Sequence, residues 1–175
     1  MSATESNLKF YKIYEDAIIP TFASSGSACF DVYAYINPEA EIVAWTDAGA
    51  KQISKQLRND KQSVVIYPNE RMLVPTGLII DIPKENLYVR LYARSGNAFK
   101  KGLTLANGLG IIDYDYIEET KVMLHNISDM NVVINNGDRV CQGELVSRLS
   151  YSLEETDLKP AAKTDRDGGF GSTGE

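Results

Sequence analysis

The sequence predicts an all-β domain, either a sandwich or a barrel. Short runs that alternate apolar and polar residues recur along the chain, which is the pattern of strands with one buried face. Residues that favour turns separate these runs, and no helical segments alternate with them. Short strands at this spacing without intervening helices are typical of all-β sandwiches and barrels.

The alternation is clearest from Ala28 to Ile36, and Asn37-Pro38 ends that run. Glycine and asparagine supply most of the turns because both tolerate positive φ. The expected strands are, in chain order, Leu8–Ile13, Ala28–Ile36, Ser63–Tyr67, Met72–Val74, Leu78–Ile82, Leu87–Ala93, Lys121–Asn126, Val132–Ile134 and Arg139–Leu149. The expected turns are Pro68-Asn69, Ser95-Gly96-Asn97, Asn107-Gly108 and Asn135-Asn136-Gly137-Asp138.

One internal segment departs from the strand pattern. Thr46–Asn59 is predicted to form a short amphipathic helix, because helix formers surround Ile53 and Leu57 at i, i+4 spacing. It lies in an insertion at about 39–62, for which we favour a solvated excursion over a partner-binding element.

The C-terminal end also departs from the pattern. Four of the 13 glycines fall in the last eight positions, so this end has a large backbone entropy to lose on ordering. Phe170 is a large apolar ring in this otherwise polar segment, and it suggests a part that orders on a flat ligand. We therefore expect one β domain over 1–158 and a flexible C-terminal arm over 159–175.

Composition excludes several functions. Eighteen Lys and Arg residues against 24 Asp and Glu residues give a net charge of −6, which argues against binding nucleic acid or an anionic membrane. No apolar run approaches the roughly 20 residues that span a bilayer, and the N-terminal residues lack a signal-peptide pattern. We expect a cytoplasmic protein.

Cysteine and histidine usage narrows the chemistry. Cys29 and Cys141 stand far apart with no CxxC motif, so two buried, reduced thiols are expected and no metal site. The only histidine, His125, lies in a strand pattern and is read as structural or exposed. If the chain is a hydrolase, its general base is then expected to be a carboxylate.

Several segments combine residues that can handle a phosphorylated ligand. Arg94-Ser95-Gly96 offers a guanidinium, a hydroxyl and an unhindered N–H group, a combination that suits phosphate oxygens. Asn107–Tyr116 is predicted to be a hairpin in which Asp113, in a partly desolvated strand between apolar residues and tyrosines, can serve as a general base. Gly137–Gln142 is a turn into a strand with one cation and one amide, and Arg166 precedes a glycine-rich stretch with an aromatic ring.

In this order the segments resemble the five motifs of the trimeric dUTP diphosphatase (dUTPase) family. The matching motifs are Ser27–Ala34, Ala93–Gly96, Asn107–Tyr116, Gly137–Gln142 and Arg166–Gly174. The stretch Leu73–Leu78, followed by Ile82-Pro83, is also typical of the family. The resemblance implies a jelly-roll-like distorted barrel, a homotrimer, and hydrolysis of dUTP to dUMP and pyrophosphate. It also implies Mg²⁺ bound through the triphosphate and water, with no protein ligand to the metal.

The resemblance assigns each matching residue a role. Asp113 is similar to the base that activates the attacking water, and Tyr116 to the residue that excludes a 2′-hydroxyl. The implied uracil-reading residues are Asn107 and the backbone around it, including Gly110, with Phe170 over the ring. The implied triphosphate ligands are Arg94, Ser95, Gly96 and Gln142, with Arg166, Ser172 and Thr173 closing on the far end of the triphosphate. Gly171 is also implied to bind the substrate. Asp31 and Arg139 match charged motif positions and are expected to support the site.

Some positions differ from the family pattern, and two rival functions remain open. Cys29 and Cys141 replace the usual glycine and alanine, Ala93 replaces proline, and Ile117-Glu118 replaces Arg-Gly. A dCTP deaminase of the same fold would require a glutamate base after the hairpin, where this chain has Leu124-His125-Asn126. The other rival is a non-catalytic trimer that binds dUTP or a protein partner through the insertion.

Overall fold

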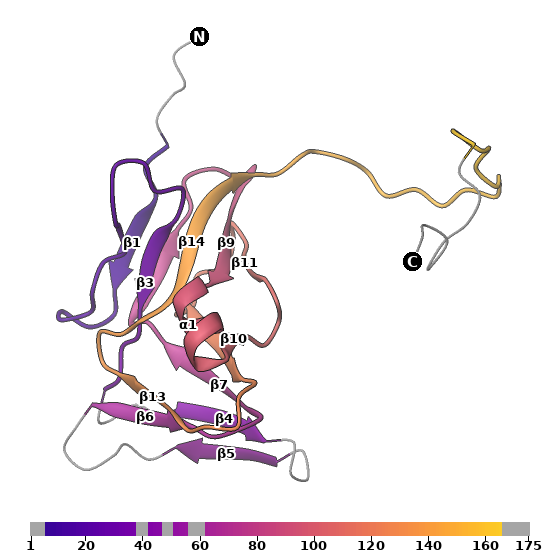
Figure 1. Cartoon of the computed structure of the whole chain (residues 1–175). Helices are drawn as coiled ribbons and strands as arrows, with labels where there is room; N and C mark the ends of the chain where they lie inside the picture. Colours follow the sequence, from indigo (N-terminus) through magenta and orange to yellow (C-terminus); the bar gives the residue numbers. More distant parts are fainter. Residues whose placement is uncertain (1–5, 38–41, 47–50, 56–61, 166–175) are drawn as a thin grey trace.

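Antiparallel sheets form the body of the protein in the computed structural model, which describes residues 6–37, 42–46, 51–55 and 62–165 (Figure 1). The strands are β1 Lys9–Lys12, β2 Thr21–Phe22, β3 Phe30–Tyr33, β4 Ile42–Thr46, β5 Lys51–Lys55, β6 Ser63–Ile66, β7 Glu70–Pro75, β8 Leu78–Asp81, β9 Leu87–Ala93, β10 Leu103–Leu105, β11 Gly110–Ile112, β12 Lys121–Asn126, β13 Val132–Asn135 and β14 Arg139–Ser147. Helix α1 spans Ser95–Lys101. In the described chain, one five-stranded sheet has the order β10-β12-β7-β4-β5 and the other has the order β11-β9-β14-β3-β2, with two-stranded pairs β1-β8 and β13-β6.

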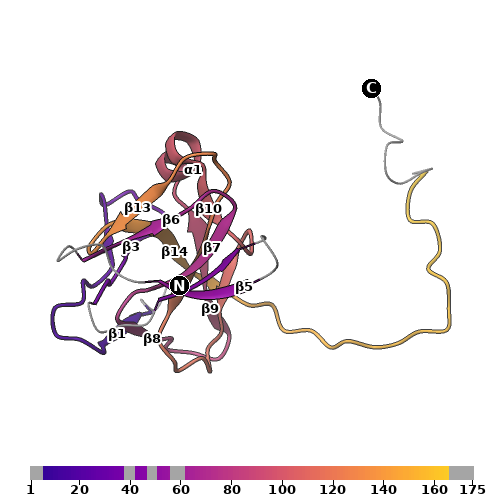
Figure 2. The ribbon, with the colours of Figure 1, turned by 90° about the horizontal axis from the view of Figure 1, so that it is seen from below.

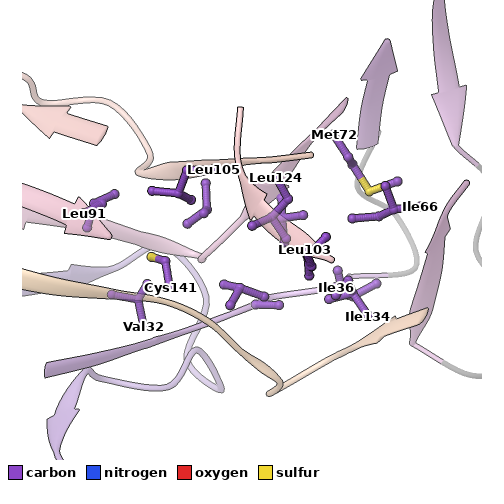
Figure 3. Packing of buried hydrophobic residues seen from close by; sticks show 14 of the residues in the cluster. Val32, Ile36, Ile66, Met72, Leu91, Leu103, Leu105, Leu124, Ile134 and Cys141 are labelled. Carbon is purple, nitrogen blue, oxygen red and sulfur yellow. The ribbon is translucent and has the colours of Figure 1, made fainter. Parts of the chain in front are cut away.

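The hydrophobic core is built from the alternating strands. In β9, Leu87, Val89 and Leu91 are buried while the tyrosines and arginine between them are partly exposed. Val122 and Leu124 of β12 contribute to the same cluster. Figure 3 shows side chains from several strands converging in this core, with Val32 and Cys141 near one end and Met72 and Ile66 near the other.

The predicted strands are largely confirmed. β9 and β12 have the expected bounds, and the other predicted strands are present with bounds that differ by a few residues at their ends. The sequence does not predict the short strands β2, β4 and β10. β2 and β10 are too short to show a clear alternation, and β4 lies within the insertion.

The helix predicted over Thr46–Asn59 is wrong in the described part of that segment. Lys51–Lys55 is instead strand β5, which pairs antiparallel with β4 from Ile42↔Lys55 to Thr46↔Lys51. A short isolated helix is marginal in water, whereas the edge of β4 offers a row of backbone hydrogen-bond partners. Residues 47–50 and 56–61 lie outside the described residues.

The helix that does form is α1, where the sequence predicts only a turn. It ends at Gly102, whose left-handed φ of 61° allows its N–H to bond back to the helix. Lys100 and Lys101 in the last turn interact favourably with the helix dipole. The all-β class is therefore confirmed, with its single described helix between β9 and β10 rather than in the insertion.

The chain beyond β14 runs away from the β-domain. Figures 1 and 2 show this segment extending from the body in both views. Residues 149–165 are exposed and form neither strand nor helix. The arm predicted from Lys159 is the distal part of this segment, and residues 166–175 lie outside the described residues.

We expect Gly143→Ala to destabilise the fold, because a Cβ at Gly143 would lie 2.5 Å from Cε2 of the Phe30 ring. Phe30 is a buried core residue, so we expect a loss of about 1–3 kcal/mol in the free energy of unfolding. Urea denaturation measures it. Gly26→Ala is the matched control, since nothing lies within 4 Å of the place that a Cβ would take at Gly26. Equal effects of the two substitutions would contradict the packing argument.

Candidate active site

A buried carboxylate organises one end of the β11-β9-β14-β3-β2 sheet. Asp31 of β3 is 3% exposed. Its Oδ1 accepts hydrogen bonds from Nε of Arg94 at 3.0 Å and from Nε2 of Gln142 at 3.3 Å. Its Oδ2 accepts one from Nη1 of Arg139 at 3.1 Å. Charge-assisted bonds of this kind are strong, so Asp31 holds these three side chains in place.

Strand register brings these residues together. Asp31 lies opposite Gln142 of β14, which lies opposite Tyr92 of β9, and Arg94 follows the end of β9. Arg139 and Gln142 would point to opposite faces of a regular strand, because side chains alternate. The register between β14 and β3 shifts between Arg139 and Cys141, which is a β-bulge. The bulge turns Arg139 to the same face as Gln142, where both reach Asp31.

Helix α1 carries the Arg94-Ser95-Gly96 segment at this same end of the sheet. Ser95 and Gly96 are exposed in its first turn, where backbone N–H groups have no acceptor within the helix. Nδ2 of Asn97 donates to the carbonyl oxygen of Arg139 at 3.1 Å, which ties α1 to β14. The sequence does not predict this role of Asn97, because asparagine after Ser95-Gly96 indicates a turn and gives no sign of a buried contact with Arg139. The result is a cluster of cationic and amide donors suited to an anion.

The two thiols behave differently from each other. Cys141 is fully buried next to this cluster, as expected, and burial raises its pKa to about 12; Asp31 adds to the effect and Arg94 opposes it. Cys29 is only half-buried, so the prediction that both thiols are buried is wrong for Cys29. Partial burial and then Glu144 raise the pKa of Cys29. Both cysteines are free in the structure.

The predicted hairpin over Asn107–Tyr116 is not a paired hairpin. β10 pairs with β12 in one sheet and β11 pairs with β9 in the other, so the connection between them crosses from sheet to sheet. Asn107 is exposed in that connection. Gly110 lets β11 approach β9 closely, because a Cβ there would lie 2.9 Å from Cβ of Leu91. Gly110 therefore has a packing role.

Asp113 lies in the turn after β11 rather than within a partly desolvated strand, and it is exposed in the single chain. Tyr116 closes this turn, since its N–H donates to the carbonyl oxygen of Asp113 at 3.2 Å. The hydroxyl of Tyr116 donates to the carbonyl oxygen of Glu119 at 3.0 Å. Partial burial, and then Glu118 and Glu119, raise the pKa of Tyr116.

The single chain does not bring Asp113 to the Asp31 cluster. Asp113 borders a cavity of about 890 Å³ that Tyr88 and Tyr151 also line. Arg94 follows the opposite end of β9, and the rise of a strand makes the stretch from Tyr88 to Arg94 about 20 Å long. The candidate site residues that fall outside the described chain are Arg166, Phe170, Gly171, Ser172 and Thr173.

The described residues carry neither a metal cluster nor a membrane helix. No group of three or more His, Cys, Asp and Glu side chains in that part of the chain could hold a metal ion. None of its helices is long and apolar enough to cross a membrane. His125 is partly buried in β12 and lies opposite Arg71 and Thr104, which agrees with the structural reading.

An all-β domain whose buried carboxylate holds two arginines and an amide carries donors that suit a small anionic ligand, and this is the class of protein that the geometry indicates. Family comparison narrows this class. The dUTPase family model matches residues 59–174. The deoxyuridine 5'-triphosphate nucleotidohydrolase of Hydrogenobaculum sp. (strain Y04AAS1) is 38% identical over 164 residues, covering 93% of this chain and 94% of that protein. That of Treponema denticola is 31% identical over 166 residues, covering 94% of this chain and 96% of that protein.

The chain belongs to the dUTPase family, and the prediction of an enzyme of this family is confirmed. Solved structures show the same fold. A mutant dUTPase of Staphylococcus bacteriophage 80alpha, solved with dUpNHpp, matches with a TM-score of 0.70 at 19% identity, covering 96% of this chain and 98% of that chain. The Streptococcus mutans dUTPase matches with a TM-score of 0.63 at 24% identity, covering 83% and 98%. The predicted jelly-roll-like fold is thereby confirmed.

We expect Cys141 to resist alkylation in the folded protein. With a pKa of about 12, its thiolate is about one part in ten thousand at pH 8, and burial blocks the reagent as well. Mass spectrometry after iodoacetamide treatment, with and without urea, measures the modification of each cysteine. Cys29 is the internal control because it is partly accessible. Faster native modification of Cys141 than of Cys29 would contradict this account.

Proposed function

We propose that this protein hydrolyses dUTP to dUMP and pyrophosphate by attack of water on the α-phosphorus. The observation that carries the proposal is the Asp31 cluster, which presents Arg94 and Gln142 at the positions of two family motifs. A triphosphate carries enough negative charge to need such donors, and they stabilise charge that develops in the transition state. The nucleotide named for the relatives and the analogue in the phage 80alpha structure support the choice of dUTP.

Each residue has a proposed role in this reaction. Asp113 takes a proton from the attacking water, and Tyr116 lies against the deoxyribose and excludes a 2′-hydroxyl. Asp31 and Arg139 support the cluster. The proposed triphosphate ligands are Arg94, Ser95, Gly96 and Gln142, with Arg166, Gly171, Ser172 and Thr173 closing from the C-terminal arm. Asn107 and the backbone at Gly110 read the uracil edge, with Phe170 over the ring.

The proposed active sites are shared between subunits of a homotrimer. Asp113 follows β11 and lies beside the start of β9, whereas Arg94 follows the end of β9. One chain therefore cannot place both residues on one triphosphate. A second copy that brings its Asp113 turn to this Arg94 completes the site. The surface around Asp113 supports such a contact, because Ile111, Tyr114 and Ile117 are 46%, 46% and 74% exposed.

Magnesium is proposed to reach the site with the substrate. Both carboxylate oxygens of Asp31 already accept hydrogen bonds from Arg94, Arg139 and Gln142, so this buried carboxylate is not free as a ligand. The donor set therefore fits an ion held by phosphate oxygens and water. When bound, Mg²⁺ would offset part of the triphosphate charge. A phage phi11 dUTPase structure is described with a structural Mg(II) ion, which supports magnesium in the family.

With a net charge of −6, the protein is proposed to be cytoplasmic and to bind neither nucleic acid nor membrane.

Product analysis tests the reaction. We expect dUTP with Mg²⁺ to give dUMP and pyrophosphate, and Asp113→Asn to lower kcat by about 10²–10⁴ while a non-hydrolysable dUTP analogue still binds. Chromatography of the nucleotides and a pyrophosphate assay measure both. Asp115→Asn is the matched control, since Asp115 is an exposed acid in the same turn. Ammonia from dCTP would instead favour the deaminase, and turnover of neither nucleotide would favour the non-catalytic trimer.

Mixing two inactive variants tests the shared site. Asp113→Asn and Arg94→Ala should each abolish most activity alone, but unfolding and refolding them together should restore part of it. In randomly mixed cyclic trimers, about one quarter of the sites would combine an intact Asp113 with an intact Arg94 from a neighbour. The dUTP turnover of the mixture, compared with each variant refolded alone, measures this recovery. A mixture no more active than its components would show that both residues serve from the same chain.

A further inference from the structure

Glu119 ties the turn that carries Asp113 and Tyr116 to the body of the protein. Its Oε1 accepts the N–H of Gly77 at 2.9 Å, in the connection between β7 and β8. Its main-chain carbonyl accepts the hydroxyl of Tyr116 at 3.0 Å. The same residue therefore contacts the rigid domain through its side chain and the candidate site through its backbone.

Gly77 is a fixed point in the structure. Its φ of +69° favours glycine, and a Cβ there would lie 3.0 Å from Cβ of Ala17 and from Cγ of Tyr35. Two further bonds join the neighbouring residues, since Oγ1 of Thr76 donates to the carbonyl of Thr120 at 2.7 Å and Thr120 N–H donates to the carbonyl of Leu78 at 2.8 Å. Packing around Gly77 and these bonds therefore hold its N–H in a defined place, where it donates to Glu119.

Hydrogen bonds as well as packing hold Tyr116 in place. Its side chain is 40% exposed, so core contacts do not hold the whole ring. Two hydrogen bonds add to that packing. The N–H of Tyr116 donates to the carbonyl of Asp113 and holds the main chain, and its hydroxyl donates to the carbonyl of Glu119 and holds the ring. A side chain excludes a larger sugar only if it is held in place. Displacement of the Tyr116 ring would therefore admit a sugar with a 2′-hydroxyl.

We propose that Glu119 is a positioning residue for sugar selection, which holds the Tyr116 ring in place through its own bond to Gly77. This inference rests on the proposed function, because it assumes that Tyr116 excludes the 2′-hydroxyl of a ribonucleotide. The hydrogen bond that Oε1 of Glu119 accepts from the Gly77 N–H holds the turn in place, and the negative charge of Glu119 is secondary. Its ion pair with Lys121, at 3.6 Å, is partly exposed and contributes little.

Three single variants separate the bond from the charge. Glu119→Ala removes the acceptor, while Glu119→Gln keeps an oxygen that can accept the Gly77 N–H. Glu118→Ala is the matched control, because it removes an equal charge from the adjacent exposed residue. The readout is the ratio of kcat/KM for dUTP to kcat/KM for UTP, since damage that only weakens the fold lowers both values together.

We expect Glu119→Ala to lower this ratio about tenfold or more, chiefly by lowering KM for UTP. Glu119→Gln should keep the ratio within about threefold of the wild type, and Glu118→Ala should leave it unchanged. An unchanged ratio in Glu119→Ala would overturn the inference, and so would an equal loss in Glu118→Ala. A wild-type protein that hydrolyses no dUTP would overturn the proposed function and the inference with it.

A fourth variant keeps the test decisive if Glu119→Ala does not fold. Tyr116→Phe keeps the ring but removes the hydroxyl bond to Glu119, at an exposed position where folding should be retained. Its dUTP-to-UTP ratio should also fall. Where both variants fold, the ratio in the double variant should fall by less than the sum of the two single effects, because both substitutions break the same chain of contacts from Tyr116 through Glu119 to Gly77. Fully additive losses, or an unchanged ratio in Tyr116→Phe, would overturn the inference.

Discussion

The buried charge of Asp31 constrains the whole β11-β9-β14-β3-β2 sheet. A carboxylate that is 3% exposed is strongly destabilising unless it is paired and hydrogen-bonded. Its partners come from three places, the start of β14, the middle of β14 and the end of β9. They meet only if β3, β14 and β9 keep one register. A one-residue slip would turn Asp31 or Gln142 to the opposite face, so the ion cluster and the strand register require each other.

Close packing beneath the cluster follows from the same constraint. Cys141 lies between Val32 and Ala93, its register partners on the neighbouring strands, and it is completely buried. Gly143 leaves room for the Phe30 ring, one residue from Asp31. The small residues of β14 thus allow the three strands to pack closely while Arg139 and Gln142 remain on the polar side. The donors are presented by a rigid core, which favours a preorganised anion site.

Sequence reasoning succeeded where one physical signal dominated. β9 and β12 have unambiguous alternation, and their bounds agree with the prediction. The i, i+4 spacing of Ile53 and Leu57 predicts a helix through Lys51–Lys55, but the available edge of β4 decided the structure of that segment. The meeting of Arg139 and Gln142 at Asp31 depends on a bulge, which alternation alone does not reveal. The Asp113 turn resembles a paired hairpin in sequence, but β10 and β11 find partners in different sheets. Glu119 gave no local signal, since its contact with Gly77 joins residues far apart in the chain.

The length of β9 also bears on how the proposed site can assemble. A strand is stiff, so the roughly 20 Å between the Asp113 turn and Arg94 cannot close by a change within one chain. The pairing of β11 with β9 holds the turn at its own end, and the Glu119 bond to Gly77 holds it from the other side. Under the proposed function, a site divided between opposite ends of one subunit requires a head-to-tail contact between copies. Such a contact closes into a ring when its rotation permits, and it then completes every site with the same pair of surfaces.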